Sequence, residues 1–369
     1  MSDSLGDGTG NPTETQINLY ERWAKGGTAL SLIGEVQASP HYPEKPGNLV
    51  LTPESDKRAL EMLAQRGSTN GAHIWPQLGH AGALSHAPIS TPKGPSALDI
   101  EGLKCDGMSI EEIHDLPETF ANAATIARDV GFGGVMIHAG HGFLLSQFLS
   151  PLFNHRSDHY GGTVDARFRI VAEVIDSVRL AVGANFPVSI RINSTDKLEG
   201  GLSNDDALHV VKLLDQTSID LIDISGGTYF PGAASSSDGT SASGPYFSDF
   251  ARRAKQLTST PITLTGGFKT REQATAAING GITDAISLAR AMVIDPSLAN
   301  TWLSEAGGDP QFPVFDAPSS GGVTAWYSMR LTALGDGTES QFNLSPEAAI
   351  DIHEARDAER CDRWKRRFA

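Results

Sequence analysis

The sequence has little cysteine, no long apolar run and no excess of positive charge, and each of these absences excludes a class of protein. Only Cys105 and Cys361 are cysteines among its 369 residues, too few for a disulfide framework or a cysteine-held iron–sulfur cluster. No stretch approaches the roughly 18 consecutive apolar residues of a transmembrane helix. The start of the chain lacks the basic end and apolar core of a signal peptide. We therefore expect a cytoplasmic protein that does not contact the membrane.

The charge balance is strongly acidic. The chain has 29 Lys and Arg against 44 Asp and Glu, a formal net charge of −15. Nucleic acids and anionic membranes both attract basic surfaces, so neither is an expected partner. With 39% hydrophobic and 20% charged residues, the composition is that of a globular domain. A small-molecule substrate is the partner that remains, and assembly into a homo-oligomer stays open.

Seven short apolar runs, each ending in a polar or glycine residue, alternate with amphipathic helical patterns. Their near-continuous apolar character is typical of parallel strands that are buried on both faces. The alternation predicts one parallel α/β domain, a TIM (β/α)8-type barrel over residues 1–302. The runs are residues 28–36, 72–77, 134–138, 187–193, 220–225, 261–265 and 284–289, and the clearest helices are 117–130, 167–182 and 205–214.

A closed barrel needs eight strands, and one is not found. Residues 44–65 and 88–115 have the pattern of a loop followed by a helix, so neither supplies it. We therefore expect the first strand to be missing or truncated at the N-terminus, which would leave a gap beside Ser2.

The remaining segments are expected to lie outside the barrel wall. Residues 303–369 form a C-terminal extension that packs on or beside the barrel, and their charged end, 353–369, predicts a solvated helix face. Segment 232–244 is small and polar and follows a strand end, so we expect a mobile loop at the barrel mouth.

Chemistry in such barrels lies at the carboxyl ends of the strands, so the polar residues there are the candidates. Gln77 offers a two-faced amide and Arg191 a fixed cationic fork, a pair that suits an electron-accepting ring with carbonyl and N–H edges. The last two strands end in Gly-Gly and Ala-Arg, where this fold often binds phosphate. Together they predict a phosphorylated heterocyclic cofactor. The candidates are Glu35, Gln77, His80, His138, His141, Arg191, Asn193, Ser225 to Tyr229, Gly266, Gly267, Ala289 and Arg290.

The sharpest local feature is the pair of histidines in His138-Ala139-Gly140-His141. Two imidazoles at a strand end can donate two N–H groups to one oxygen anion. They can instead bind a metal, which would need a third ligand, or be satisfied core residues. Because both lie at an expected barrel mouth, anion or carbonyl binding is the favoured interpretation, and no metal is predicted.

The segment 137–162, IHAGHGFLLSQFLSPLFNHRSDHYGG, closely resembles the Old Yellow Enzyme family of flavin-dependent ene-reductases. The family pattern is His, two small residues, His or Asn, Gly, an aromatic residue, FLSP, Asn-x-Arg-x-Asp and Gly-Gly. The resemblance spans residues 1–300 and includes LYERWAKGG at 19–27, QLGHAG at 77–82, SIRIN at 189–193 and LARAMVIDP at 288–296.

The resemblance implies non-covalent FMN across the barrel mouth, with NAD(P)H as the reductant. Gln77 would bind the pyrimidine edge and Arg191 would lie near N1 and O2, while His138 and His141 would hold the oxygen of an activated alkene. The substrates implied are enones, enals and nitro compounds, whose C=C bond receives hydride from flavin N5. The implied cofactor-binding set is Ser2, Glu35, Gln77, Arg191, Gly266, Gly267, Ala289 and Arg290.

One departure concerns the proton donor. The family commonly has a Tyr two positions after the second His, and here that position is Phe143, which has no proton to give. Phe143 and Tyr229 are expected in the substrate pocket, and Tyr229, Glu35 or solvent remain as substitutes. Two alternatives stay open: a relative that acts on nitro compounds or dienoyl thioesters, and a flavin-binding pseudoenzyme or impaired truncated barrel.

Overall fold

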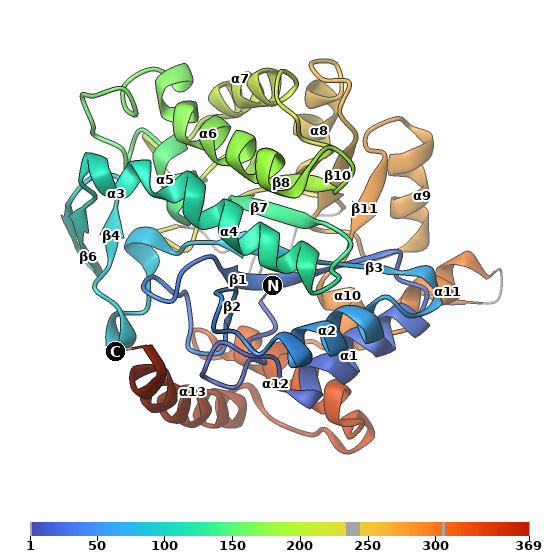
Figure 1. Cartoon of the computed structure of the whole chain (residues 1–369). Helices are drawn as coiled ribbons and strands as arrows, with labels where there is room; N and C mark the ends of the chain where they lie inside the picture. The colour runs from blue at the N-terminus through green and yellow to red at the C-terminus, as the bar shows by residue number, and fades with distance from the viewer. Residues whose placement is uncertain (1, 234–243, 305–306, 369) are drawn as a thin grey trace.

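The computed structural model describes residues 2–233, 244–304 and 307–368. Its centre is a curled parallel sheet of eight strands in the order β11-β10-β9-β8-β7-β3-β1-β2, with helices outside it (Figure 1). All seven predicted runs are strands of this sheet, which confirms the barrel-type fold. The strands are β1 Leu30–Gln37, β2 Leu49–Val50, β3 His73–Gly79, β7 Val135–Ala139, β8 Val188–Asn193, β9 Leu221–Ser225, β10 Ile262–Thr265 and β11 Ala285–Ser287.

The helices follow the strands along the chain, as expected for α/β units. The longer ones are α1 Glu14–Lys25, α2 Lys57–Gly67, α4 Leu116–Asp129, α6 Val164–Val182, α7 Asn204–Leu214, α9 Arg271–Asn279, α12 Gly322–Asp336 and α13 Pro346–Phe368. The shorter ones are α3 Ile110–His114, α5 Leu144–Leu149, α8 Ser248–Ala254, α10 Arg290–Ile294 and α11 Leu298–Leu303, with 3₁₀ turns at Thr69–Gly71, Gly82–Leu84, Ala87–Ile89 and Glu339–Gln341.

The sheet does not close into a ring within the residues that the structure describes. There β11 pairs only with β10, and β2 meets β1 only at Val36 and Gln37. The backbone N–H of Asp3 donates to the carbonyl of Gly34 at 3.1 Å, so the chain enters alongside β1. This is the flank that the first strand of a closed barrel would occupy, and among the described residues the sheet is open there.

The register of the parallel strands determines which side chains meet at the barrel mouth. His138 on β7 is paired with Arg191 on β8, and Arg191 with Asp223 on β9. Two pairs further along, Asn193 lies beside Ser225. Because these strands end at the same edge of the sheet, residues far apart in the sequence face one space.

Helix α6 shows how the sequence specifies an outer helix. The side chain of Thr163 accepts a hydrogen bond from the backbone N–H of Ala166 and caps the first turn. Gly183, with a φ of +84°, ends the helix in a conformation that glycine adopts without strain. The predicted apolar stripe lies against the sheet, and its members Phe168, Val171, Val174, Ile175 and Val178 are all buried.

Both segments that were expected to be a loop followed by a helix also contain strands. Segment 44–65 supplies the short edge strand β2, whose two residues are too few to show a strand pattern in the sequence. Segment 88–115 differs more. It contains a second sheet in the order β4-β6-β5, followed by α3. These strands are two to five residues long and mostly not buried, so they lack the apolar pattern that reveals a strand in a sequence. They are β4 Lys93–Gly94, β5 Leu98–Ile100 and β6 Leu103–Gly107.

The C-terminal helices pack against the start of the chain. Tyr327, Leu331 and Leu334 of α12 share an apolar cluster with Leu5 and with Leu19 of α1. The boundary at 302–303 itself remains a prediction.

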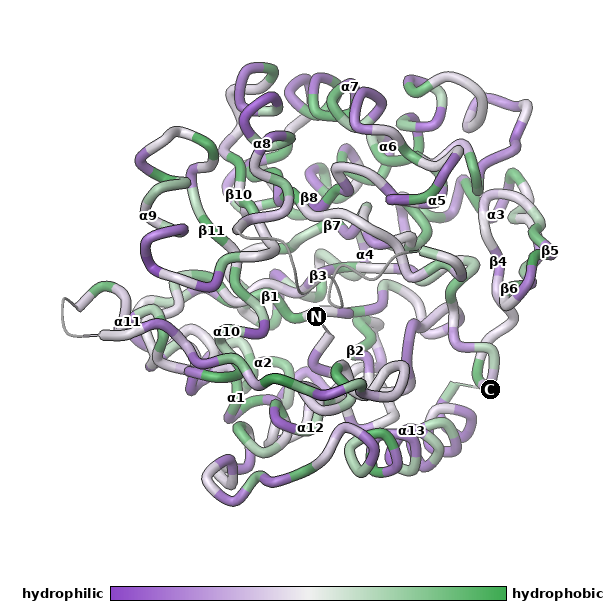
Figure 2. Tube along the Cα trace, turned by 180° about the vertical axis from the view of Figure 1, so that it is seen from behind, coloured by the Kyte–Doolittle hydropathy of each residue, from purple (hydrophilic) through white to green (hydrophobic). Residues whose placement is uncertain are grey.

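Helix α13 is not the simple solvated face that its charges predicted. Trp364 is only 2% exposed, and Arg360 is buried and donates to the carbonyl of Ser4 at 2.7 Å. Figure 2 shows α13 as a mixture of hydrophobic and hydrophilic residues. The apolar face could not be recognised in the sequence, because most positions of the segment are charged. A few buried residues are enough to anchor such a helix.

The expected loop at 232–244 falls mostly on residues 234–243, outside the described part of the chain. None of the described helices has the length and apolar character needed to cross a membrane.

We expect Trp364→Ala to lower the free energy of unfolding by about 3–5 kcal/mol, because it empties a buried aromatic site. Urea unfolding followed by fluorescence and circular dichroism would measure the change. The control is Arg366→Ala, on the exposed side of the same turn, for which we expect a change within about 0.5 kcal/mol. Equal effects of the two substitutions would contradict the buried anchor.

Candidate functional site

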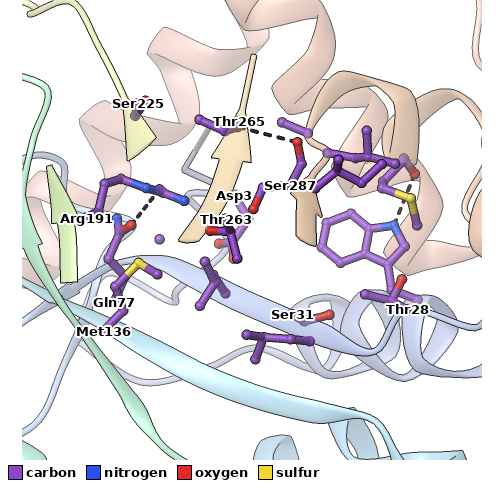
Figure 3. Close-up of a pocket in the computed structure, with 18 of the residues that line it drawn as sticks. Asp3, Thr28, Ser31, Gln77, Met136, Arg191, Ser225, Thr263, Thr265 and Ser287 are labelled. Carbon is purple, nitrogen blue, oxygen red and sulfur yellow. Dashed lines mark hydrogen bonds between the residues drawn. The ribbon is translucent and has the colours of Figure 1, made fainter. Parts of the chain in front are cut away.

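A cavity of about 590 Å³ opens inside the curled sheet and along its open flank. Its wall is largely apolar, and polar side chains from several strands, among them Gln77, Arg191 and Ser287, line it as well (Figure 3). A concave apolar site with a few convergent polar groups is the usual form of a small-molecule site. The residues predicted for the site that line this cavity are Ser2, Glu35, Gln77, His138, His141, Phe143, Arg191, Ser225, Tyr229 and Ala289.

Arg191 carries a guanidinium into the cavity and is held there by two neighbours. Its Nε donates to Asp223 at 2.5 Å, and its Nη1 donates to Oε1 of Gln77 at 2.6 Å, the contact drawn in Figure 3. Asp223 is fully buried and also accepts from the hydroxyls of Thr263 at 2.5 Å and Ser287 at 3.1 Å. The cation is thus neutralised and its orientation is fixed.

The two predicted histidines are in direct contact. Nε2 of His138 lies 3.0 Å from Nδ1 of His141, and Nε2 of His141 lies 2.7 Å from Oγ of Ser225. His141 has a φ of +58°, a strained conformation for a residue with a side chain. The amide of Asn193 accepts from its backbone N–H at 2.9 Å and stabilises this conformation.

Both imidazoles are neutral. Burial lowers the pKa of His138 and of His141 well below the ordinary value, and the nearby Arg191 guanidinium lowers both further. A neutral imidazole has one N–H donor and one acceptor nitrogen. The pair can therefore donate hydrogen bonds to a ligand oxygen without carrying charge.

Glu35, at the end of β1, faces His138 from the other side. Its Oε1 contacts Nδ1 of His138 and accepts from Nε2 of Gln77 at 2.6 Å. Burial raises the pKa of Glu35 to about 8 and that of the neighbouring Glu44, which also lines the cavity, to about 7. Glu35 is therefore a protonated, neutral acid at neutral pH.

Phe143 and Tyr229 lie next to each other beside the histidines. The Phe143 ring is 5.0 Å from the His138 ring, and the Tyr229 ring is 5.9 Å from Phe143 and 6.0 Å from His141. The backbone N–H of Tyr229 donates to the carbonyl of His141 at 3.1 Å and anchors the loop after β9. Gly142 permits this approach, since a Cβ there would lie 1.9 Å from the Thr228 hydroxyl.

Tyr229 is 64% exposed and is one of the residues that line the cavity. Loss of water around the hydroxyl, followed by the charges of Glu44 and Glu35, raises its pKa to about 12, so the phenol keeps its proton.

The residues predicted to bind phosphate are arranged differently. Gly266 and Gly267 have φ of +92° and +87°, and a Cβ on Gly267 would lie 2.4 Å from the carbonyl of Gly244. The Arg290 guanidinium lies 5.9 Å from the centre of the Tyr327 ring. These three residues are not in the described lining of the cavity, and their role remains a prediction.

His80, another strand-end candidate, is a structural residue. Its ring stacks on Tyr42 at 4.4 Å, and its Nδ1 accepts from the backbone N–H of Gly82 at 3.0 Å. Burial lowers its pKa to about 3. Within the described residues, no group of three or more His, Cys, Asp or Glu side chains is placed to bind a metal.

Sequence reasoning missed Asp223 and Glu44. Asp223 is the acidic residue within the apolar run LIDIS, and a charged residue inside a parallel strand is a signal that could have been used. Glu44 lies in a segment without regular structure, and its sequence context carries no comparable signal.

Comparison with known proteins gives a consistent result. The sequence profile of the NADH:flavin oxidoreductase / NADH oxidase family matches residues 3–305. The NADH-dependent flavin oxidoreductase iliE of Neonectria sp. (strain DH2) is 33% identical over 335 residues, which are 81% of this chain and 44% of that protein. The protein named iliE in Hypocrea jecorina (strain QM6a) is 31% identical over 333 residues, 82% of this chain and 83% of that protein. The chain thus spans less than half of the first relative and most of the second.

Two solved structures extend the comparison. A 2-naphthoyl-CoA reductase in complex with 2-naphthoyl-CoA superimposes with a TM-score of 0.76 at 27% identity, over 82% of this chain and 48% of that one. An old yellow enzyme homologue from Zymomonas mobilis gives a TM-score of 0.71 at 23% identity, over 85% and 89% of the chains. The second likeness supports the fold alone.

The raised pKa of Glu35 predicts that stability falls as pH rises from 6.5 toward 8. In the native state the acid keeps a proton that the unfolded chain has lost above its ordinary pKa of 4.5. Its contribution is therefore complete below pH 4.5 and is lost as pH rises through about 8. His138 and His141, whose folded pKa values lie below 6.5, change their contribution only below pH 6.5.

Urea unfolding at a series of pH values would measure this dependence. Glu35→Gln should remove a slope of up to about 1.4 kcal/mol per pH unit, most clearly above pH 7, where Glu44 no longer contributes. Glu101→Gln, at an exposed carboxyl, is the matched control. Parallel curves for the wild type and Glu35→Gln would show that Glu35 is ionised in the native state.

Proposed function

Because the chain belongs to the NADH:flavin oxidoreductase / NADH oxidase family, we propose that it reduces the C=C bond of an activated alkene with a nicotinamide nucleotide. The predicted family is confirmed, and with it FMN as cofactor and a nicotinamide as reductant. The observation that carries the alkene proposal is the contact between two neutral imidazoles, His138 and His141, in the wall of one apolar cavity. Enones, enals and nitro compounds are the substrate class.

The cavity residues fit FMN. The amide of Gln77 and the fork of Arg191 match a ring with carbonyl and N–H edges, and the fixed cation stabilises negative charge on that ring after reduction. Two buried hydroxyls in the lining, Ser2 Oγ and Thr28 Oγ1, have no hydrogen-bond partner among the described residues and are available to a polar ligand. Ala289, with Gly267 and Arg290, is our proposed site for the phosphate.

The bound flavin would supply hydride to the β-carbon of the alkene. The role of His138 and His141 is to bind the substrate oxygen, on which enolate charge develops as the hydride adds. Two N–H donors fixed in a water-poor cavity stabilise that charge without having to reorganise. Their neutrality matters, because each imidazole keeps one nitrogen as an acceptor for the contacts that orient it.

Proton delivery to the α-carbon is assigned to Tyr229. Phe143 occupies the position where a tyrosine would serve, and the Tyr229 ring lies 5.9 Å from it over the same cavity. Its raised pKa keeps the phenol protonated and thus ready to donate.

An aryl or dienoyl thioester is the second substrate candidate. The observation that favours it is the similarity, at 27% identity, to a reductase solved with 2-naphthoyl-CoA. Reoxidation of the reduced protein by 2-naphthoyl-CoA but not by a simple enone would favour this candidate.

We expect the purified protein to be yellow, to be bleached by NADH or NADPH without oxygen, and to regain its colour with 2-cyclohexenone. Replacing both His138 and His141 by Ala should weaken enone binding by about 100-fold or more and leave FMN bound. Stopped-flow absorbance would measure both half-reactions. Full enone affinity in the double variant would contradict the assignment, and bleaching without reoxidation by any alkene would favour the flavin-binding pseudoenzyme.

We further expect Tyr229→Phe to slow reoxidation by the enone by about 100-fold, since a positioned proton donor is lost. Reduction by the nicotinamide should change little. Adding Phe143→Tyr to this variant should restore part of the rate, because the phenol returns from the neighbouring position. An unchanged rate in Tyr229→Phe would assign the proton to solvent or to Glu35.

A further inference from the structure

A continuous chain of hydrogen bonds runs from Glu35 through both imidazoles to Ser225. Oε1 of Glu35 contacts Nδ1 of His138, and Nε2 of His138 is 3.0 Å from Nδ1 of His141. The chain ends where Nε2 of His141 is 2.7 Å from the Ser225 hydroxyl. The proposed function needs N–H donors from both rings, and this chain determines which nitrogen of each ring carries the hydrogen.

Two arrangements satisfy every contact. Each contact holds one hydrogen, and each neutral imidazole supplies one. With Glu35 protonated, its O–H donates to Nδ1 of His138, and the hydrogens of His138 and His141 are then on Nε2. With Glu35 ionised, it accepts from Nδ1–H of His138, both rings carry their hydrogen on Nδ1, and the Ser225 hydroxyl donates to His141. The two arrangements differ by one proton, which is released to solvent.

Only the first arrangement offers N–H groups to a ligand. Nδ1 of His138 is turned toward Glu35, and Nδ1 of His141 is turned toward His138, so the Nε2 atoms are the ones free to exchange their partners for a substrate oxygen. In the second arrangement both Nε2 atoms carry lone pairs, which repel an oxygen anion.

The burial of Glu35 favours its protonated form, and the groups around the carboxyl offset only part of the cost of ionising it. Arg191 is paired with Asp223, and its other hydrogen bond goes to Oε1 of Gln77, which turns the amide N–H of Gln77 toward Glu35. Within the described residues, the hydrogen-bond partners of the Glu35 carboxyl are thus one amide and one neutral imidazole. The second oxygen, Oε2, packs against Gly79, where a Cβ would lie 2.0 Å away.

We propose that Glu35 is a positioning residue that keeps its proton and thereby holds His138 and His141 in the Nε2–H tautomer that binds the substrate oxygen. This proposal depends on the proposed function only for the identity of the ligand that the two histidines bind. The coupling between the proton of Glu35 and the tautomers of the two histidines follows from the hydrogen-bond chain.

A pH dependence follows from the same contacts. The groups that face Glu35 are Arg191 on β8, the two histidines after β7, Glu44 from the segment after β1 and Tyr229 from the loop after β9. Burial raises the pKa of Glu35, and the hydrogen bond from Gln77 and the charge of Arg191 lower it by a smaller amount. The resulting pKa is about 8. The histidines and Tyr229 stay uncharged across this range, and Glu44 titrates lower, at about 7. Substrate-oxygen binding should therefore be present below pH 8 and be lost above it.

Two variants should lock the two tautomers. In Glu35→Gln the amide oxygen must face the N–H of Gln77, so it accepts from His138 and fixes hydrogen on Nδ1. In Glu35→Leu the nearest polar group to Nδ1 of His138 is Nε2 of Gln77 at 3.2 Å, which donates and fixes hydrogen on Nε2. The control is Glu44→Gln, which removes a neighbouring carboxyl that does not touch the histidines and should retain the switch.

The test is nuclear magnetic resonance of the FMN-bound protein with isotopically labelled histidine, between about pH 6 and about pH 9.5. Ring-nitrogen shifts distinguish the two tautomers directly. We expect His138 and His141 to change together near pH 8 in the wild type, and to stay fixed, in opposite tautomers, in Glu35→Leu and Glu35→Gln. At neutral pH the Gln variant should bind 2-cyclohexenone at least about tenfold more weakly than the Leu variant.

A wild-type spectrum without a tautomer change, or the same tautomer in both variants, would overturn the proposal. The wild-type titration needs no substitution, so it decides even if a variant fails to fold. The tautomer inference and the proposed function can also fail separately. If the tautomers change with pH but no enone reoxidises the protein, the inference stands and the alkene proposal fails. If an enone reoxidises the protein but the tautomers do not change, only the inference fails.

Discussion

The pairing of the partly buried Arg191 guanidinium is the constraint on which the rest of the site depends. A cation inside an apolar barrel needs a counter-charge and hydrogen bonds for its remaining donors. Asp223 on the next strand supplies the charge, and the oxygen of Gln77 accepts the next hydrogen bond. Once the oxygen of Gln77 is engaged, its N–H must point the other way, toward Glu35. The orientation of Arg191 thus determines the orientation of the Gln77 amide, which in turn determines the hydrogen bond that Glu35 accepts.

Within the described residues, this arrangement leaves Glu35 without an ion pair to Lys or Arg. The charge of Arg191 is already balanced by Asp223, so it offsets only part of the cost of ionising a buried carboxyl. The acid and the two imidazoles beside it are therefore neutral together, and their hydrogen bonds act as fixed dipoles. A site of this kind suits a reaction in which negative charge appears on a substrate oxygen, because the N–H groups are in place before the charge forms.

The sequence was sufficient for those parts of the fold that arise from short-range pattern. Apolar runs located all seven predicted strands, and because parallel strands end at one edge, their last residues identified Gln77, His138 and Arg191 as neighbours. The pattern could not show that Asp223 pairs with Arg191, since that depends on register, nor that Glu35 keeps a proton, since that depends on burial. The buried face of α13 and the small sheet of β4, β5 and β6 were missed because few of their residues are apolar and buried.

The open flank of the described sheet lies beside the strand that carries Glu35. Near Glu35, β1 pairs with β3 on one side and, at Val36 and Gln37, with the short β2 on the other. The Asp3 to Gly34 hydrogen bond adds a further contact on that flank. The β1–β3 ladder is interrupted between Ile33 and Val36, so Glu35 itself is positioned in part by its side-chain contacts with Gln77 and His138. Glu35, which determines the proton positions on the histidines, is thus itself positioned by contacts that include His138. The hydrogen-bond network therefore forms as a unit rather than one residue at a time.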